Sequence, residues 1–102
     1  MGQEQVQKQG QSAVRPVPRE PQKHDVIILN DDFTTFEFVI MVMMTVFCKT
    51  EEEACTIAET THVHKKAKVG TYSLDIAKSK VAKAVNIARA EGFPLRFDIQ
   101  KA

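Results

Sequence analysis

The chain has 102 residues, of which 43% are hydrophobic and 26% are charged, and its formal net charge is +1. These values are typical of a single water-soluble domain. A charge so close to zero gives no general attraction to nucleic acid or to an anionic membrane, so either partner would need a local basic patch. The most apolar run, residues 38–48, is about half as long as the roughly 20 residues that a membrane-spanning helix needs, so no membrane span is expected.

The first segment, residues 1–24, differs in composition from the rest. It contains six glutamines, three prolines and two glycines, but no Leu, Ile or Phe. We therefore expect a disordered tail over residues 1–24 and one folded domain over residues 25–102. The tail has no apolar stretch of a secretory signal, and Val6 stands where a myristoylation motif needs Ser or Thr. Because Cys48 and Cys55 lack CxxC spacing, we interpret them as reduced thiols of a cytoplasmic protein, with a lone disulfide left open.

One strand and two helices are predicted in the first half of the domain. Residues 26–29 form an unbroken apolar run between polar residues, which suits a central strand or one covered on both faces. Thr34 begins an S/T-x-x-E capping box, which predicts a helix from there to about Phe47. Thr50 begins a second capping box, followed by a second helix. One side of that helix should carry Ala54, Ile57, Ala58, Thr61 and His62.

The second half predicts a strand, a helix and a strand. Residues 67–72 suit a strand, and Ser73 opens a third helix that Gly92 is placed to end in a left-handed turn. The last segment alternates apolar and polar residues, as a half-buried strand does, with Leu95, Phe97 and Ile99 on one face. The order β-α-α-β-α-β predicts a small two-layer α+β domain in which a three-stranded sheet packs against helices. So small a core favours a surface site over an enclosed catalytic cavity.

Three polar residues, Asn30, Asp31 and Asp32, directly follow the first strand. Taken alone, they are explained by side-chain turns to nearby backbone N–H groups, and His62 alone is explained as an exposed histidine. If the two helices form a hairpin, the loop and the end of the second helix approach each other. Asn30, Asp31 and His62 would then share one pocket rim. Several acceptors together suit an ammonium group, which has three N–H donors.

At this point the residues carry a family resemblance. The segments VIILNDDFTTFEFV, EEEA, VGTYSLDIAKSKV and ARAEGFPL, with His62 eight residues before Gly70, resemble ClpS, the adaptor family of the bacterial Clp proteases. The resemblance covers nearly all of residues 25–102 and implies three helices on a three-stranded antiparallel sheet. It also implies an adaptor, not an enzyme, that needs no cofactor. Such an adaptor binds proteins with a bulky hydrophobic N-terminal residue, an N-degron, and delivers them to a Clp AAA+ unfoldase.

The resemblance also implies residue roles. The substrate's α-amino group would contact Asn30, Asp31 and His62. An unfoldase of ClpA or ClpC type would dock through its N-terminal domain on a surface at Asp75 and Lys80. The tail over residues 1–24 would take part in delivery. We expect the adaptor itself to be a monomer. The pocket for the first side chain would be formed by Ile28, Asp32, Thr34, Phe36, Val39, Ala58, Thr61 and Leu95.

Four positions depart from the family pattern. Phe36 stands where methionine is common, and Ala58 and Thr61 stand where larger apolar residues are common. The pocket shape should therefore differ, and the ranking of Phe, Tyr, Trp and Leu as first residue stays open, as do the unfoldase and the physiological substrates. Lys65 stands where glycine is common. If that residue must be left-handed, lysine costs about 1 kcal/mol there.

Other functions are weaker interpretations of the sequence. A metal enzyme could use His62-x-His64 with Asp31 or Cys55, but no further ligands are suitably spaced, so we expect no metal. A Cys–His hydrolase lacks an orienting group and an oxyanion motif. The basic stretch at residues 64–68 is short and has no interleaved aromatic residues, so we expect no nucleic-acid partner. The main alternative is a protein-recruitment domain of this fold without amino-group recognition, as ribosomal stalk proteins illustrate. An exposed methionine patch on the first helix remains open as a contact surface.

Overall fold

The computed structural model describes residues 22–102, so the predicted tail over residues 1–24 lies almost wholly outside the described residues. The first strand begins at Lys23, slightly before the expected start of the domain at Asp25. In chain order the elements are β1 (Lys23–Leu29), α1 (Phe36–Thr45), α2 (Glu51–His64), β2 (Lys66–Ser73), α3 (Leu74–Ala90) and β3 (Arg96–Lys101). The predicted order β-α-α-β-α-β is confirmed.

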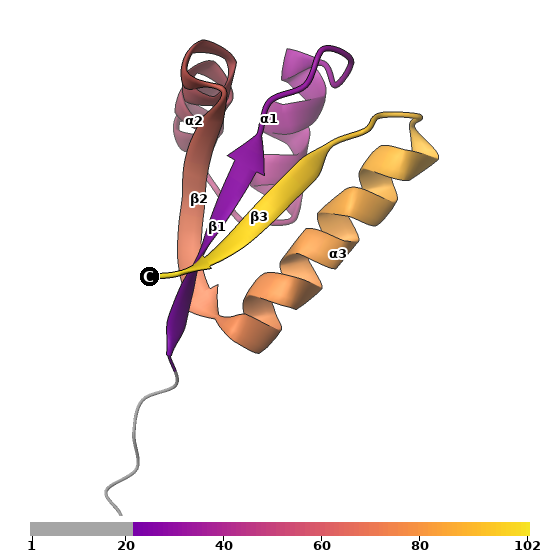
Figure 1. Cartoon of the computed structure of the whole chain (residues 1–102). Helices are drawn as coiled ribbons and strands as arrows, with labels where there is room; N and C mark the ends of the chain where they lie inside the picture. Colours follow the sequence, from indigo (N-terminus) through magenta and orange to yellow (C-terminus); the bar gives the residue numbers. More distant parts are fainter. Residues whose placement is uncertain (1–21) are drawn as a thin grey trace, which may run out of the picture.

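The sheet has β1 at its centre, with β2 and β3 as antiparallel neighbours on either side. Pairing on both edges satisfies the backbone hydrogen-bonding groups of β1, as the central position predicted for this strand requires. Val26 and Ile28 are fully buried. α2 packs on β2, and α3 contacts all three strands. Figure 1 shows α1 and α2 side by side at one end of the sheet and α3 running beside β3, so the predicted α+β architecture is confirmed.

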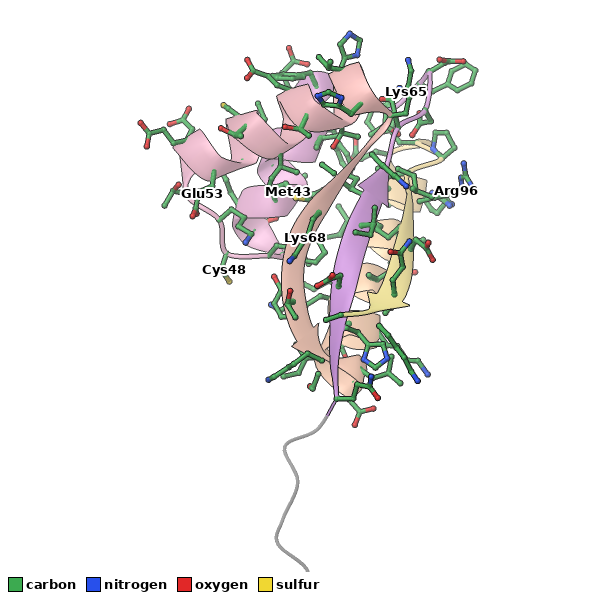
Figure 2. All side chains as sticks on the ribbon, turned by 60° about the vertical axis from the view of Figure 1, so that its left-hand side comes forward. Met43, Cys48, Glu53, Lys65, Lys68 and Arg96 are labelled. Atoms are coloured by element: carbon green, nitrogen blue, oxygen red, sulfur yellow. The ribbon has the colours of Figure 1, made fainter. Side chains whose placement is uncertain are left out.

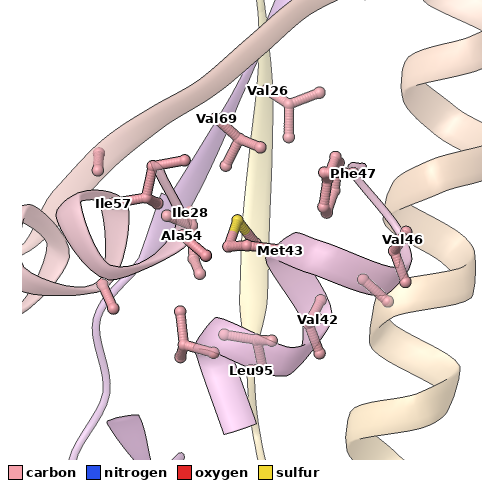
Figure 3. Close-up of a cluster of buried hydrophobic side chains, with 14 of the residues drawn as sticks. Val26, Ile28, Val42, Met43, Val46, Phe47, Ala54, Ile57, Val69 and Leu95 are labelled. Carbon is pink, nitrogen blue, oxygen red and sulfur yellow. The ribbon is translucent and has the colours of Figure 1, made fainter. Parts of the chain in front are cut away.

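α1 supplies the largest share of the core. Its side chains Phe38, Val39, Val42 and Met43 are buried. Figure 3 shows Met43 projecting from α1 among side chains that include Ile28, Ala54 and Ile57. Met41 and Met44 are 38% and 40% exposed, so part of the methionine-rich surface does face outward. Because α2 and the sheet cover only part of α1, a helix that is apolar almost all round keeps an exposed side.

The start of α1 differs from the prediction. The N-cap is Thr35, whose side chain accepts a hydrogen bond from Phe38 N–H at 3.2 Å. Thr34, which the capping-box pattern had indicated, belongs instead to the preceding loop, where its hydroxyl donates to Asp31 Oδ2 at 2.7 Å. Only Thr34 has a glutamate three residues later, but either threonine can cap a helix, and the hydrogen bonds from Thr34 to Asp31 leave Thr35 as the N-cap.

The start of α2 follows the prediction. Thr50 Oγ1 accepts from Glu53 N–H at 3.1 Å, and Glu53 Oε1 accepts from Thr50 N–H at 2.9 Å, which completes the capping box. Lys65 ends the helix with a φ of 73°, in the left-handed region. The buried side of α2 consists of Ala54, Ile57, Ala58 and Thr61. His62 was expected on that side but is exposed in the last turn.

α3 lies close to the sheet because its inward residues are small. Ala77, Ala84 and Ala88 are fully buried. Gly92 ends the helix at a φ of 80°, as predicted, and the N–H groups of Gly92 and Phe93 donate to the last carbonyl groups of the helix at 3.0 and 2.9 Å. This pattern is a Schellman motif. Cys48 and Cys55 are free thiols, so the disulfide left open by the sequence is not formed.

Candidate functional site

The main pocket lies where β1 ends and the loop to α1 begins, beside the end of α2. Its volume is about 510 Å³. Figure 1 shows β1 pointing between α2 and α1, toward this end of the molecule. One side of the pocket is polar and the other is largely apolar. The lining residues are Asn30, Asp31, Asp32, Thr34, Phe36, Val39, Ala58, Thr61, His62 and Lys65.

The loop that follows β1 is organised by the carboxylate of Asp31. Asp31 Oδ1 accepts from Phe33 N–H at 2.8 Å and from Thr34 N–H at 2.7 Å, while Oδ2 accepts from the Thr34 hydroxyl at 2.7 Å. The side-chain turn that was considered as the simple explanation of this residue therefore exists. A carboxylate has about four lone-pair positions, and these bonds occupy three of them. Asp31 still has one position on Oδ2 for a further donor.

These bonds also set the ionisation of Asp31. Partial burial is the largest single influence and raises the pKa. The hydrogen bonds from Thr34 and Phe33 and the nearby positive charge of Arg96 act in the opposite direction and together outweigh it. The net result is a pKa below the ordinary value of 3.8. Asp31 is therefore a carboxylate at neutral pH and presents a negative charge to the pocket.

A backbone hydrogen bond joins the two chain segments that form the polar side. Asn30 N–H donates to Lys65 C=O at 2.9 Å. This bond continues the pairing of β1 with β2, in which Leu29 lies opposite Lys66. It holds the end of β1 against the end of α2, and His62 lies one turn before that end. Two segments that are distant in sequence thus meet as the hairpin argument predicted.

We call Asn30, Asp31 and His62 the polar rim. His62 is exposed and Asn30 is half-buried. Within residues 22–102, no hydrogen bond occupies the side chain of either residue, and neither contains a buried atom without a partner. The amide oxygen of Asn30 and the imidazole of His62 are therefore available to a ligand. Together with Asp31 Oδ2, they give the pocket three acceptor groups from two elements.

The apolar wall consists of Phe36, Val39, Ala58 and Thr61. Val39 and Ala58 are 8% and 4% exposed, so they form the floor of the pocket. Thr61 is 3% exposed, and its hydroxyl donates to Ile57 C=O at 2.7 Å, which leaves its methyl group as the free branch. Phe36 is 42% exposed at the mouth. This wall suits an apolar side chain.

Four of the residues singled out from the sequence lie away from the pocket lining. Ile28 and Leu95 are 0% and 1% exposed and belong to the core. Asp75 is exposed in the first turn of α3. Lys80 Nζ donates to Val46 C=O at 3.1 Å and lies 5.7 Å from the ring centre of Tyr72, so this lysine is already engaged within the fold.

Sequence reasoning did not include Lys65 among the site residues, although the structure places it in the lining. Its position just after His62 was the available signal. Among the described residues, no group of three or more His, Cys, Asp or Glu side chains is arranged to hold a metal ion. Within the same range, no helix has the length and apolar character needed to cross a membrane.

Comparison with known proteins assigns this sequence and fold to a class of proteolysis adaptors. The family model for the ATP-dependent Clp protease adaptor protein ClpS matches residues 19–98. The ClpS of Nautilia profundicola is 46% identical over 76 residues, which are 74% of this chain and 78% of the relative. The ClpS of Treponema denticola is 40% identical over 82 residues, which are 80% of this chain and 81% of the relative.

A solved structure agrees with the sequence matches. Agrobacterium tumefaciens ClpS2 bound to L-phenylalaninamide superposes with a TM-score of 0.78 at 34% identity, covering 81% of this chain and all of that chain. The chain therefore belongs to the ClpS family, whose members are adaptors of the Clp protease and not the protease itself. The family resemblance found in the sequence is confirmed.

Proposed function

We propose that this protein binds the N-terminal residue of other proteins and delivers them to a Clp AAA+ unfoldase for degradation. The polar rim receives the α-amino group, and the apolar wall, with Asp32 and Thr34 beside it, receives a bulky hydrophobic side chain. Ile28 and Leu95 support this wall from the core. One observation carries the proposal: a single pocket combines three acceptors with an apolar wall.

The ligand of a relative supports the same chemistry. The Agrobacterium tumefaciens protein was solved with L-phenylalaninamide, a molecule with one free amino group, one phenyl ring and an amide in place of the following peptide bond. An ammonium group donates three hydrogen bonds, which is the number of acceptor groups that the polar rim offers. The phenyl ring is of the size and polarity that the apolar wall suits.

Both halves of the site are needed for useful affinity. Burying one large apolar side chain contributes about 1.5–3 kcal/mol, whereas micromolar binding corresponds to roughly −8 kcal/mol. Each charge-assisted hydrogen bond to the ammonium group adds about 1.5–3 kcal/mol. The apolar wall alone therefore leaves binding weak, and a free N-terminus is required.

The remaining partners follow from the family. The unfoldase, of ClpA or ClpC type, docks through its N-terminal domain on the surface at Asp75 and Lys80. That surface lies outside the pocket lining, so the two partners do not compete for the same residues. The protein acts as a monomeric adaptor in the cytoplasm and performs no catalysis of its own. Residues 25–102 carry both binding surfaces.

The test compares peptides that differ only at the amino group. A peptide that begins with Phe is labelled at its C-terminus and titrated with the protein by fluorescence anisotropy, with its N-acetylated form as the comparison. Loss of two charge-assisted bonds predicts a more than ~100-fold weaker affinity for the acetylated peptide. A peptide that begins with Ala is the control for the apolar wall. Equal affinity for the free and acetylated forms would favour the recruitment domain that lacks amino-group recognition.

A further inference from the structure

The side chain of Lys65 has no use in the proposed function, although it lines the same pocket as the polar rim. An ammonium group cannot accept a hydrogen bond, and it repels the ammonium group of a bound N-terminus. Of the lysines within residues 22–102, only Lys65 belongs to this lining. Lys66, next in the chain, lines a separate pocket with Ile27 and Ala67.

The position of Lys65 is fixed by its backbone. Its left-handed φ of 73° ends α2, and its carbonyl oxygen accepts the hydrogen bond from Asn30 N–H at 2.9 Å. Figure 2 shows Lys65 where α2 passes into β2, at the same end of the molecule as Arg96. The Lys65 side chain is exposed, and within the part of the chain that the structure describes it forms no salt bridge. A free cation is thus anchored at the pocket rim.

The neighbouring carboxylates do not cancel this charge. Asp31 accepts three hydrogen bonds inside its own loop and also interacts electrostatically with Arg96. Asp32 lines the same pocket, and within residues 22–102 no salt bridge joins it to Lys65. A pocket of about 510 Å³ that opens to solvent holds one large residue, so the residues that follow lie outside it, along the rim that Lys65 extends.

We propose that Lys65 makes the site select protein N-termini that carry an acidic side chain at the second residue, and disfavour basic ones. This inference rests on the proposed function, because it concerns the residues next to the one held in the pocket. An exposed ion pair of this kind changes affinity by roughly 1.5- to 5-fold. That range is modest for one site, but it is enough to rank competing substrates.

The experiment uses peptides that begin with Phe and differ only at the second residue, which is Asp, Asn, Lys or Gln. Binding to the full chain is measured by fluorescence anisotropy at about 50 mM salt, where screening is weak. The expected order of affinity is Asp above Asn and Gln, with Lys weakest. The ratio of Asp to Asn should disappear in Lys65→Asn, because asparagine is neutral and tolerates left-handed backbone.

A matched variant separates a local charge from a net charge. Lys83→Gln removes one exposed lysine from α3, outside the pocket lining, and should leave the Asp preference unchanged. Equal affinities of the Asp and Asn peptides for the unmodified protein would overturn the inference. So would an Asp preference that persists in Lys65→Asn or disappears in Lys83→Gln. If no peptide beginning with Phe binds, the proposed function fails and the inference fails with it.

Discussion

Asn30 shows how one residue can serve the fold and the site with different atoms. Its backbone N–H donates to Lys65 C=O and closes the junction between β1 and α2. Its side chain lines the pocket and makes no hydrogen bond within residues 22–102. The two roles are separable by mutation, because truncating the side chain leaves the backbone bond in place.

We therefore predict that Asn30→Ala weakens binding of a peptide that begins with Phe by about 10- to 100-fold, the loss expected for one charge-assisted hydrogen bond. The thermal midpoint of the variant should stay within about 2 °C of the unmodified protein, because no bond within the described fold is lost. Anisotropy and calorimetry measure the two effects. A large fall in the midpoint would show that the side chain supports the fold instead.

Asp31 differs from Asn30, because its side chain serves the loop directly. Its pKa lies below the ordinary value of 3.8, since the bonds from Thr34 and Phe33 outweigh desolvation. A group with a depressed pKa in the folded state stabilises the fold at neutral pH, and that contribution is lost as the pH falls through the folded value. The relevant window is therefore below about pH 4.

We predict that Asp31→Asn lowers the free energy of unfolding by about 1 kcal/mol at pH 7, because the hydrogen bonds lose their charge assistance. The difference from the unmodified protein should shrink as the pH falls below about 4, where aspartate itself becomes protonated. Urea unfolding at pH 7 and pH 3 measures both values. Asp32→Asn is the control, since Asp32 is exposed in the same loop and its side chain accepts no hydrogen bond within residues 22–102. A difference that does not shrink at all between pH 7 and pH 3 would contradict the assignment.

Phe36 is the residue that we expect to limit which side chains the pocket accepts. It stands at the mouth with 42% of its surface exposed, opposite the small side chains of Ala58 and Thr61. A rigid aromatic ring in this position excludes shapes that a flexible methionine admits. We predict that Phe36→Ala broadens binding toward bulky and β-branched first residues. A peptide panel that varies only in the first residue measures this, with Phe36→Met as the matched variant. An unchanged ranking would mean that Phe36 is not the limiting group.

At the scale of elements, the caps explain both what the sequence predicted and where it failed. The start of α2 and the end of α3 were predicted because capping boxes and glycine act within a few residues. The start of α1 was misplaced by one residue, since the claim of Asp31 on Thr34 depends on how the loop folds. His62 lines the pocket with Ala58 and Thr61, on the predicted side of α2, but its exposure did not follow from helical spacing, which cannot tell where the neighbouring elements stop covering a helix.

Two helices end in a left-handed residue, and we predict that substitutions at these two positions change the free energy of unfolding in opposite directions. Lys65 and Gly92 have φ values of 73° and 80°. Lys65→Gly should raise the free energy of unfolding by about 0.5–1 kcal/mol, and Gly92→Ala should lower it by about 1 kcal/mol. A Cβ at position 92 meets no atom within 4 Å, so its effect isolates the backbone conformation. Urea denaturation measures both variants. Destabilisation by Lys65→Gly would show that the lysine side chain contributes packing that outweighs its backbone strain.

At the scale of the whole molecule, nine of the ten residues that line the pocket had been named from the family resemblance, but the sequence did not separate the lining from the core directly behind it. Apolar periodicity placed β1 and the buried side of α2 correctly, and the hairpin argument brought Asn30 and Asp31 near the end of α2. Ile28 and Leu95 were expected in the pocket and instead lie in the core behind it. Whether an apolar side chain lines a cavity or fills the layer beneath depends on packing within a few ångströms. Periodicity does not carry that information.

The core of so small a domain depends on few side chains, and Met43 is the central one. It is fully buried, and Figure 3 shows it between α1, α2 and the sheet. We predict that Met43→Ala lowers the free energy of unfolding by about 2–5 kcal/mol, whereas Met43→Leu costs less than about 1.5 kcal/mol. Urea denaturation compares the two variants. Equal losses would mean that methionine is needed for its shape or sulfur atom and not for its volume.

The hydrogen bond between Asn30 and Lys65 also determines how the pocket is lost when the protein unfolds. It joins the end of β1 to the end of α2, which are distant in sequence, so neither segment forms the pocket without the other. Heat, denaturant or a truncation that separates these segments should abolish peptide binding in the same transition in which the sheet unfolds. If the proposed function is correct, an unfolded molecule would then lose its bound N-terminus completely, instead of binding it with reduced affinity.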